Sequence, residues 1–295
     1  MTILLTGATG FLGCHVLDLL LQEGCTVVCF GRRAAASSTQ AGKLVNVIGD
    51  LATGGGFQEV PWTEIDAVVH LAASGVKAKH RVWVDALEVN VVGTQRLLES
   101  VATRATRVPV VFIARTFYEH LVGQSPVLLE NPYIATKLAA SELASLWAGS
   151  YRGTTIFGTF FQVYGPGDDA GNVLSYAAGE IKAGRPAVFG SGRGLRDWIY
   201  ITDAAAAVVA ALQTGKSGVT EVDIGTGTLV SIRDMVERLS TVAGKVDVQV
   251  IFDPALDRPD TTYTLKAVNR PFGWAPCLSR DRGLELLFTS MEHDS

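Results

Sequence analysis

The chain of 295 residues carries little charge and has no apolar run long enough to cross a membrane. Its formal net charge of −4 excludes the strongly basic surface that nucleic acids or anionic membranes attract. The apolar stretch "VLDLLLQEG" is too short to span a bilayer and contains charged residues. Because 48% of the residues are hydrophobic and only 18% are charged, we expect a sizeable buried core rather than disorder.

Cysteine is also scarce. Cys14, Cys25, Cys29 and Cys277 show no Cys-x-x-Cys spacing, and the histidines form no metal-ligand pattern with them, so no metal site is predicted. Buried, reduced thiols are the simplest interpretation. No signal peptide precedes "ILLTGATG", and we therefore expect a soluble, cytoplasmic protein.

The first half of the chain alternates between β-rich apolar runs and segments of helical period. Strands are expected at 3–6, 26–30, 45–48, 67–70, 109–113 and 154–161, with helices at 12–23, 84–104 and 131–148. The strands are almost continuously hydrophobic, as expected for strands that helices cover on both faces. The pattern predicts an α/β fold with a Rossmann-type, doubly wound parallel sheet.

The rhythm changes after "VYGPGD", where turn residues become denser and the strands stand further apart. We expect a dinucleotide-binding domain at 1–164, to which 197–224 returns. A smaller α/β domain for a substrate is expected at 165–196 and 225–295.

The stretch "TGATGFLG" joins the first strand to the first helix and places Gly7, Gly10 and Gly13 three residues apart. Glycine permits a tight turn and lets the backbone approach a pyrophosphate, while the N–H groups at the start of the following helix, near Phe11 and Leu12, favour anions. An ordinary turn is the alternative. The position of the loop after the first strand of a βαβ unit favours a dinucleotide site.

The end of the second strand indicates which dinucleotide is bound. NAD-binding folds usually place a carboxylate here for the ribose 2′-hydroxyl, but "CFGRR" supplies Arg32 and Arg33 instead. A guanidinium can bind a 2′-phosphate, although both arginines could simply be solvated. The cofactor predicted is NADP(H).

Two later stretches also suit a cofactor. In "GDL", Asp50 and the adjoining Leu51 follow the third strand, where a carboxylate can accept a hydrogen bond from adenine. In "HLAAS", small residues at the end of the fourth strand would let the backbone run beside the cofactor; these are Leu71, Ala72 and Ala73. His70 is interpreted as a packed strand residue rather than a catalyst.

The helix in "NPYIATKLAASELASLWA" places Tyr133 and Lys137 on one face. A free tyrosine has a pKa of about 10, and a nearby lysine together with a positive nicotinamide ring would lower it. At the end of the fifth strand, "VVFIARTFYEH" offers Thr116 as a hydroxyl that could hydrogen-bond a substrate oxygen. The pair could also be ordinary helix surface, but the order of the motifs favours catalysis.

With the glycine loop and "HLAAS", this pair resembles the short-chain dehydrogenase/reductase superfamily. The chain is most similar to its extended branch, the NAD-dependent epimerases and dehydratases, and within it to reductases of CDP-linked 4-keto-dideoxysugars. The motifs "NVVGTQRLLE", "FFQVYGPGD", "SGRGLRDWIYITDAA" and "RPD" carry the resemblance. It implies that Asn90, Phe160 and Val163 also contact the cofactor. Ala114–Arg115 replaces the serine pair that the family usually has before Thr116.

The resemblance also implies a nucleoside-diphosphate-sugar substrate and a homodimer. Arg196 and Arg258 match diphosphate-binding arginines, although Arg196 and Asp197 could instead form a structural ion pair. The remaining substrate-binding residues implied are Thr116, Phe117, Gln162, Asn172 and Val173.

The reaction type follows from two absences. The resemblance implies that dehydratases and decarboxylases of this branch carry acids directly after the strand-five hydroxyl. Here Phe117 and Tyr118 follow Thr116, so elimination lacks its base, and the acid-free "GRR" disfavours a retained NAD. We expect NADPH-dependent reduction of the C4 ketone of a nucleoside-diphosphate-linked 4-keto-deoxysugar. A 4-epimerase with retained NAD and a catalytically silent, NADP-sensing regulator are the alternatives.

Overall fold

A computed structural model describes residues 1–39, 41–77, 80–213, 217–257, 264–271 and 273–290. The chain forms two compact units. The first contains Met1–Phe160, Ala205–Asp223 and Pro271–Trp274, and the second contains Phe161–Ala204, Ile224–Arg270 and Ala275–Ser295. Residues 197–204, which were expected to return to the first unit, group with the second. They include most of strand β9 (Leu195–Tyr200), which pairs with two other strands of the second unit.

The first unit is built on a seven-stranded sheet in the order β10-β6-β5-β4-β1-β2-β3. The strands are β1 (Thr2–Thr6), β2 (Thr26–Gly31), β3 (Lys43–Ile48), β4 (Ala67–His70), β5 (Val110–Thr116), β6 (Thr154–Phe160) and β10 (Gly218–Ile224). The ladders from β3 to β6 are parallel, which brings the carboxyl ends of these strands to one edge. This confirms the predicted Rossmann-type sheet, and Thr116 is the last residue of β5.

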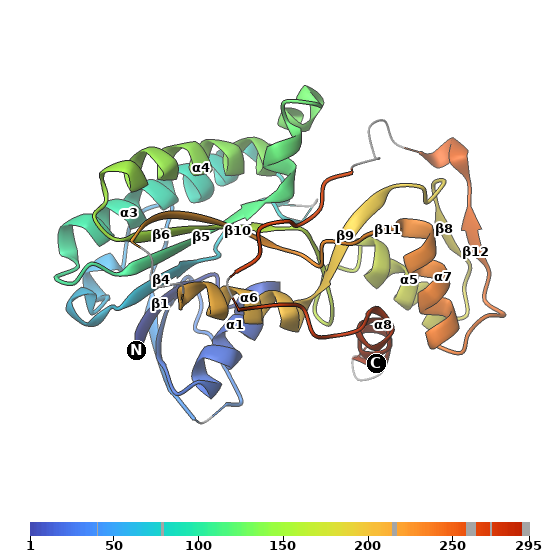
Figure 1. Cartoon of the computed structure of the whole chain (residues 1–295), viewed down its shortest axis with the longest axis horizontal. Coiled ribbons are helices and arrows are strands. Elements are labelled where there is room, and N and C mark those ends of the chain that lie inside the picture. Colours follow the sequence, from blue (N-terminus) through green and yellow to red (C-terminus); the bar gives the residue numbers. More distant parts are fainter. Residues whose placement is uncertain (40, 78–79, 214–216, 258–263, 272, 291–295) are drawn as a thin grey trace. The chain divides into compact units, whose positions relative to one another are not determined.

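Helices cover both faces of this sheet, with α3 and α4 on one face and α1 and α6 on the other (Figure 1). Their bounds are α1 (Phe11–Gln22), α2 (Trp83–Ala86), α3 (Gly93–Arg104), α4 (Pro132–Ser150) and α6 (Ile201–Leu212). The 3₁₀ helices are η1 (Phe57–Glu59), η2 (Trp62–Glu64), η5 (Phe117–Leu121) and η6 (Pro126–Glu130). The helix expected over 84–104 is interrupted by a π-helix, η4 (Leu87–Val92), which periodicity did not predict.

Local sequence explains where α4 begins. The Asn131 side chain accepts a hydrogen bond from the backbone N–H of Tyr133 at 3.0 Å, and Pro132 occupies the first helical position. Asparagine is a favoured N-cap, and proline lacks only an N–H that would have had no partner in the helix. Tyr133 therefore lies in the first turn of a helix whose start is fixed.

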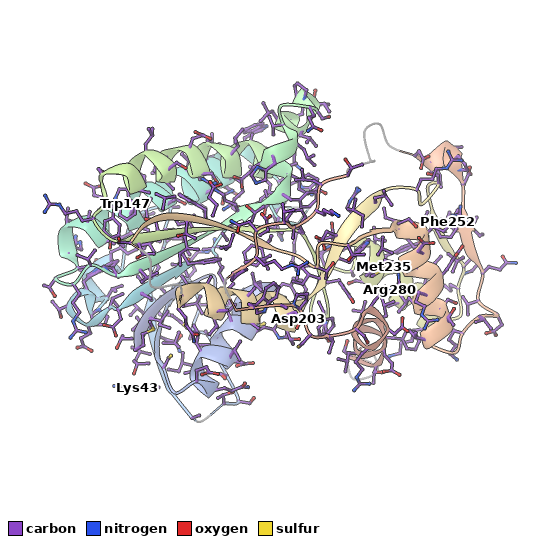
Figure 2. The ribbon with its side chains drawn as sticks, in the orientation of Figure 1. Lys43, Trp147, Asp203, Met235, Phe252 and Arg280 are labelled. Carbon is purple, nitrogen blue, oxygen red and sulfur yellow. The ribbon has the colours of Figure 1, made fainter. Side chains whose placement is uncertain are left out.

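The second unit has its own small core. Its described residues contain the sheet β11-β9-β7, the two-stranded sheet β12-β8, three α-helices and one 3₁₀ helix. Their bounds are β7 (Gln162–Tyr164), α5 (Val173–Lys182), β8 (Ala187–Phe189), β9 (Leu195–Tyr200), β11 (Leu229–Ser231), α7 (Ile232–Val242), β12 (Val250–Phe252), η7 (Pro254–Leu256) and α8 (Arg280–Ser290). Met235 on α7 is fully buried, and Phe252 on β12 stacks on Phe189 with ring centroids 5.7 Å apart (Figure 2).

Candidate active site

The glycine loop packs tightly against the end of β4. Gly7 has φ +79°, and a Cβ on it would lie 2.7 Å from the backbone nitrogen of Ala72 and 2.9 Å from the carbonyl carbon of Leu71. A Cβ on Gly13 would lie 1.9 Å from the carbonyl oxygen of Gly7. Only glycine satisfies either position, so the loop, α1 and the 71–73 segment are held together by backbone packing.

Gly10 is different, because its backbone is extended and its hypothetical Cβ would come no closer than 3.2 Å to the Gly7 carbonyl oxygen. It is the N-cap of α1, and within the described chain no side chain caps it. The first turn, which contains Phe11 and Leu12, also lacks an acid. Such a helix N-terminus presents N–H groups and positive potential, which suits the pyrophosphate of a dinucleotide.

Arg32 and Arg33 follow the last residue of β2, and both are exposed. The loop beyond them is anchored by Asn46, whose side-chain oxygen accepts from the Ala35 N–H at 2.8 Å and whose amide donates to the Ala35 carbonyl at 3.0 Å. The two guanidinium groups are thus presented from a tethered loop, at the position where NAD-binding folds place an acid.

The other segments predicted to contact the cofactor have structural partners of their own. Asp50 Oδ1 accepts from the Ala52 N–H at 2.9 Å and shapes the turn after β3, whereas the Leu51 side chain is buried in the core. Leu71 to Ala73 remain partly exposed. All residues predicted to contact the cofactor lie in the first unit except Val163, which belongs to β7 of the second.

A buried hydrogen-bond chain runs beneath this edge of the sheet. His70 Nδ1 lies 2.7 Å from Thr6 Oγ1, and His70 Nε2 lies 2.9 Å from Thr94 Oγ1. Thr94 donates to the Asn90 carbonyl at 2.6 Å, and Thr6 accepts from the Ala72 N–H at 3.3 Å. Burial lowers the pKa of His70 to about 3, so the imidazole is neutral at pH 7 and has a structural role.

The Asn90 side chain links this chain of hydrogen bonds to α4. Its oxygen accepts from the Ser74 N–H at 2.7 Å, and its amide donates to the Ser74 carbonyl at 3.0 Å and to Thr136 Oγ1 at 2.8 Å. Asn90 is buried within the π-helix η4. Its amide therefore holds the segment after β4 against the helix that carries Tyr133 and Lys137.

The structure brings together the three residues predicted to be catalytic. The Thr116 side chain, at the end of β5, hydrogen-bonds to that of Tyr133 on α4. Lys137, one turn further along α4, is buried, and its Nζ donates to the Ala114 carbonyl at 2.5 Å. A hydroxyl, a phenol and an ammonium group thus gather at the carboxyl edge of the sheet, where open α/β sheets bind their ligands.

The protein's own groups act on the pKa of Tyr133 in both directions. Burial raises it above the ordinary value, the charge of Glu119 raises it further, and the Thr116 hydrogen bond and the charge of Arg81 oppose them. Burial lowers the pKa of Lys137, Glu119 opposes this, and Arg115 adds to it. Desolvation of the phenol therefore outweighs the nearby cations, and Tyr133 is protonated at neutral pH.

Sequence reasoning missed three residues near Tyr133. Glu119 follows Thr116 by three residues, which is the spacing of a capping box and could have been recognised. Gly75 has φ +82°, and a Cβ on it would lie 3.4 Å from the Cβ of Tyr133. Arg81 Nε donates to the Gly75 carbonyl at 3.4 Å, a contact that no local pattern predicts.

The residues predicted to bind substrate are divided between the two units. Phe117 is buried in η5 of the first unit, while Gln162, on β7, and Val173, at the start of α5, are partly buried in the second. Asn172 is exposed, and its amide donates to Asp168 Oδ1 at 2.7 Å. Phe160, predicted to contact the cofactor, ends β6 and packs edge-on against Phe112.

Arg196 lies on β9, and one of its guanidinium nitrogens donates to the Leu195 carbonyl at 2.7 Å. The neighbouring Asp197 is buried and accepts hydrogen bonds from the backbone N–H groups of Thr226, Gly227 and Ala267 at 2.7–2.9 Å. Asp197 therefore organises two loops of the second unit. Arg258 lies outside the described residues.

Within the described ranges, no group of three or more His, Cys, Asp or Glu side chains is placed to bind a metal ion. Among the helices described, none is both long and apolar enough to cross a membrane.

Residues 3–225 match the model of the NAD dependent epimerase/dehydratase family. The chain belongs to this family. The resemblance to the extended short-chain dehydrogenases/reductases is thereby confirmed, as is the Rossmann-type fold on which these enzymes are built.

Several members of this family match the chain over nearly its whole length. CDP-abequose synthase of Salmonella typhimurium is 24% identical over 97% of this chain and 96% of its own length. UDP-glucose 4-epimerase of Bacillus subtilis is 27% identical over 97% of this chain and 94% of its own. Among solved structures, MoeE5 in complex with UDP-glucuronic acid and NAD is 26% identical, with a TM-score of 0.81 and full coverage of both chains. These relatives support an enzyme that acts on nucleotide sugars with a nicotinamide cofactor.

Proposed function

We propose that this family member uses NADPH to reduce the C4 ketone of a nucleoside-diphosphate-linked 4-keto-deoxysugar. The observation that carries the proposal is the hydrogen bond between Thr116 and Tyr133, with Lys137 one turn along the same helix. NADPH, when bound, supplies the hydride. Tyr133 donates its phenolic proton to the oxygen that develops charge, and Thr116 polarises the same oxygen.

The protonation state of Tyr133 favours the direction of reduction. Burial raises the pKa of the phenol, so its proton is present at neutral pH. A proton donor of this kind serves the reduction of a ketone, whereas alcohol oxidation first needs the phenolate. Lys137 offsets the charge that remains on Tyr133 after proton transfer, which lowers the cost of that transfer.

The choice of NADPH is supported by the end of β2. Arg32 and Arg33 are exposed there, where a carboxylate would repel a 2′-phosphate and a guanidinium would bind it. In the second unit, Arg196 is the described candidate for the diphosphate of the sugar nucleotide. The match to CDP-abequose synthase supports a nucleotide-linked deoxysugar as the substrate.

The second candidate is a nucleotide-sugar 4-epimerase, which the matches to UDP-glucose 4-epimerases favour. An epimerase returns the hydride to the same sugar and retains its NAD. It would therefore interconvert sugars without added cofactor, and the denatured protein would release NAD.

The deciding experiment measures NADPH oxidation by the purified protein with a panel of nucleotide-linked 4-ketosugars, with NADH in parallel. We expect turnover with NADPH, slower turnover with NADH, and no NAD released on denaturation. A second assay supplies UDP-glucose without cofactor and measures UDP-galactose. Epimerisation there, with released NAD, would establish the epimerase instead. Cofactor binding without turnover in both assays would indicate a regulator.

A further inference from the structure

Of the two opposite charges buried in this part of the first unit, one belongs to the proposed site and one lies beside it. Among the described residues of the first unit, Glu119 is the one buried carboxylate and Lys137 the one buried ammonium group. Burying either charge alone is costly, and a buried charge normally has a partner of opposite sign. The proposed reaction uses Lys137 but assigns nothing to Glu119.

Glu119 is fixed to the residue that contacts Tyr133. Its Oε1 accepts from the backbone N–H of Thr116 at 2.9 Å, while the Thr116 side chain accepts from the backbone N–H of Glu119, so that the two form a complete capping box. This pair of bonds defines where β5 ends and η5 begins. The Thr116 hydroxyl, which meets Tyr133, is thereby held in place from both sides of the turn.

The charge of Glu119 also affects the pKa values of two groups on α4, Lys137 and Tyr133. It raises the pKa of Lys137, which burial and the charge of Arg115 lower. It raises the pKa of Tyr133 as well, together with Tyr118 and against Arg81. Both effects keep protons on the two groups of α4.

We propose that Glu119 is a positioning residue of the site, which caps the turn after β5 and thereby holds Thr116 against Tyr133 on α4. The inference rests on the proposed function for its catalytic consequence, but its electrostatic part can be tested without a substrate.

The first test is a double-mutant cycle on urea unfolding of the full chain, with Glu119→Gln and Lys137→Met. Glutamine retains an oxygen that can accept from Thr116, so Glu119→Gln removes mainly the charge. Each single variant should lower the unfolding midpoint, because each removes one of the two opposite charges buried in this part of the first unit. The double variant should lose less than the sum of the two shifts. Additive shifts would overturn the electrostatic pairing.

The second test is the pH dependence of kcat for ketone reduction. The reaction needs a protonated Tyr133 and a charged Lys137, so activity falls as pH rises through their pKa values. Removing the Glu119 charge lowers both pKa values, and the alkaline limb should therefore move to lower pH. Glu142→Gln makes the same chemical change on an exposed position of α4 and should leave the profile unchanged.

Glu119→Ala removes the cap as well as the charge. It should also lower kcat at neutral pH, by roughly tenfold to a hundredfold, because the Thr116 hydroxyl is no longer held. An unmoved alkaline limb in Glu119→Gln would overturn the catalytic part of the proposal. If the unmodified protein reduces no ketosugar, the proposed function fails, but non-additive unfolding midpoints would still establish the pairing of Glu119 with Lys137.

Discussion

The buried histidine of the first unit makes a quantitative prediction about acid stability. The Thr94 hydroxyl donates its proton to the Asn90 carbonyl. Thr94 Oγ1 must therefore accept the hydrogen bond from the Nε2–H of His70. His70 Nδ1 is then an acceptor and receives the hydroxyl proton of Thr6. The directions of these bonds define one neutral tautomer, protonated on Nε2. A second proton on Nδ1 would face the Thr6 oxygen and break the arrangement.

The magnitude follows from the shift in pKa. The pKa of His70 falls from 6.5 to about 3 on folding. Between these pH values the unfolded chain binds a proton at His70 and the folded chain does not. A depressed pKa stabilises the fold above pH 6.5, and this contribution is lost as pH falls towards 3. At about 1.4 kcal/mol per pH unit, moving from pH 7.5 to pH 5 should cost roughly 2 kcal/mol at this residue.

The assay compares urea unfolding at pH 7.5 and pH 5 for the protein and for His70→Gln. Glutamine can both donate and accept but does not titrate, so the variant keeps every other ionisable group and lacks this one. The unmodified protein should lose roughly 2 kcal/mol more than the variant between the two pH values. Imidazole NMR signals should show His70 neutral, as the Nε2–H tautomer, at both. Equal losses, or a His70 signal that titrates between pH 7.5 and pH 5, would refute the reasoning.

Three further predictions concern the reaction. Tyr133→Phe should fold and bind NADPH but lose turnover by roughly a hundredfold or more, as for loss of a general acid; Tyr118→Phe, assayed in parallel with a ketosugar, should stay near normal. Arg32→Ala should weaken NADPH binding by about tenfold and NADH binding little, as cofactor titrations would show, because only NADPH carries the 2′-phosphate; equal losses would contradict the NADP assignment. Arg196→Ala should raise KM for the sugar nucleotide while the Kd for NADPH is unchanged, and a matched loss of NADPH affinity would mean that this arginine does not serve the diphosphate.

The main sheet could be predicted from the sequence because its strands are short, continuous apolar runs between turn residues. The expected strands at 3–6 and 67–70, for example, became β1 and β4 with changes of no more than one residue at either end. The helix expected at 131–148 begins at its proline and extends to Ser150. In each case local chemistry sets the boundary.

The parts that sequence could not supply depend on tertiary contacts. The π-helix η4 places Asn90 between Ser74 and Thr136. The pattern of apolar residues in "LEVNVV" does not predict a π-helix. The pKa of Tyr133 was expected to be lowered by Lys137 together with the nicotinamide ring. Among the protein's own contributions, burial is the largest and raises this pKa, and burial cannot be read from a motif. The charge of Arg81 reaches Tyr133 only because the fold brings the segment after β4 to α4.

The replacement of the family's serine pair by Ala114–Arg115 is explained by the packing of Arg115. Its guanidinium lies 3.7 Å from the centre of the Phe157 ring and donates to Ser145 at 2.7 Å and to Glu221 at 2.9 Å. It thereby connects β5 to β6, α4 and β10, and Thr116 remains the hydroxyl that meets Tyr133.

This replacement has an electrostatic consequence for α4. The partly buried Arg115 guanidinium lowers the pKa of Lys137, which burial has already lowered, so the charged form of the lysine becomes more difficult to maintain. Glu119 acts in the opposite sense on the same group. A serine in place of Arg115 would impose no such cost. Arg115→Ser should therefore move the alkaline limb of kcat to higher pH, in the direction opposite to the shift caused by Glu119→Gln. A limb that moves to lower pH in Arg115→Ser would show that the guanidinium does not disfavour the charged lysine.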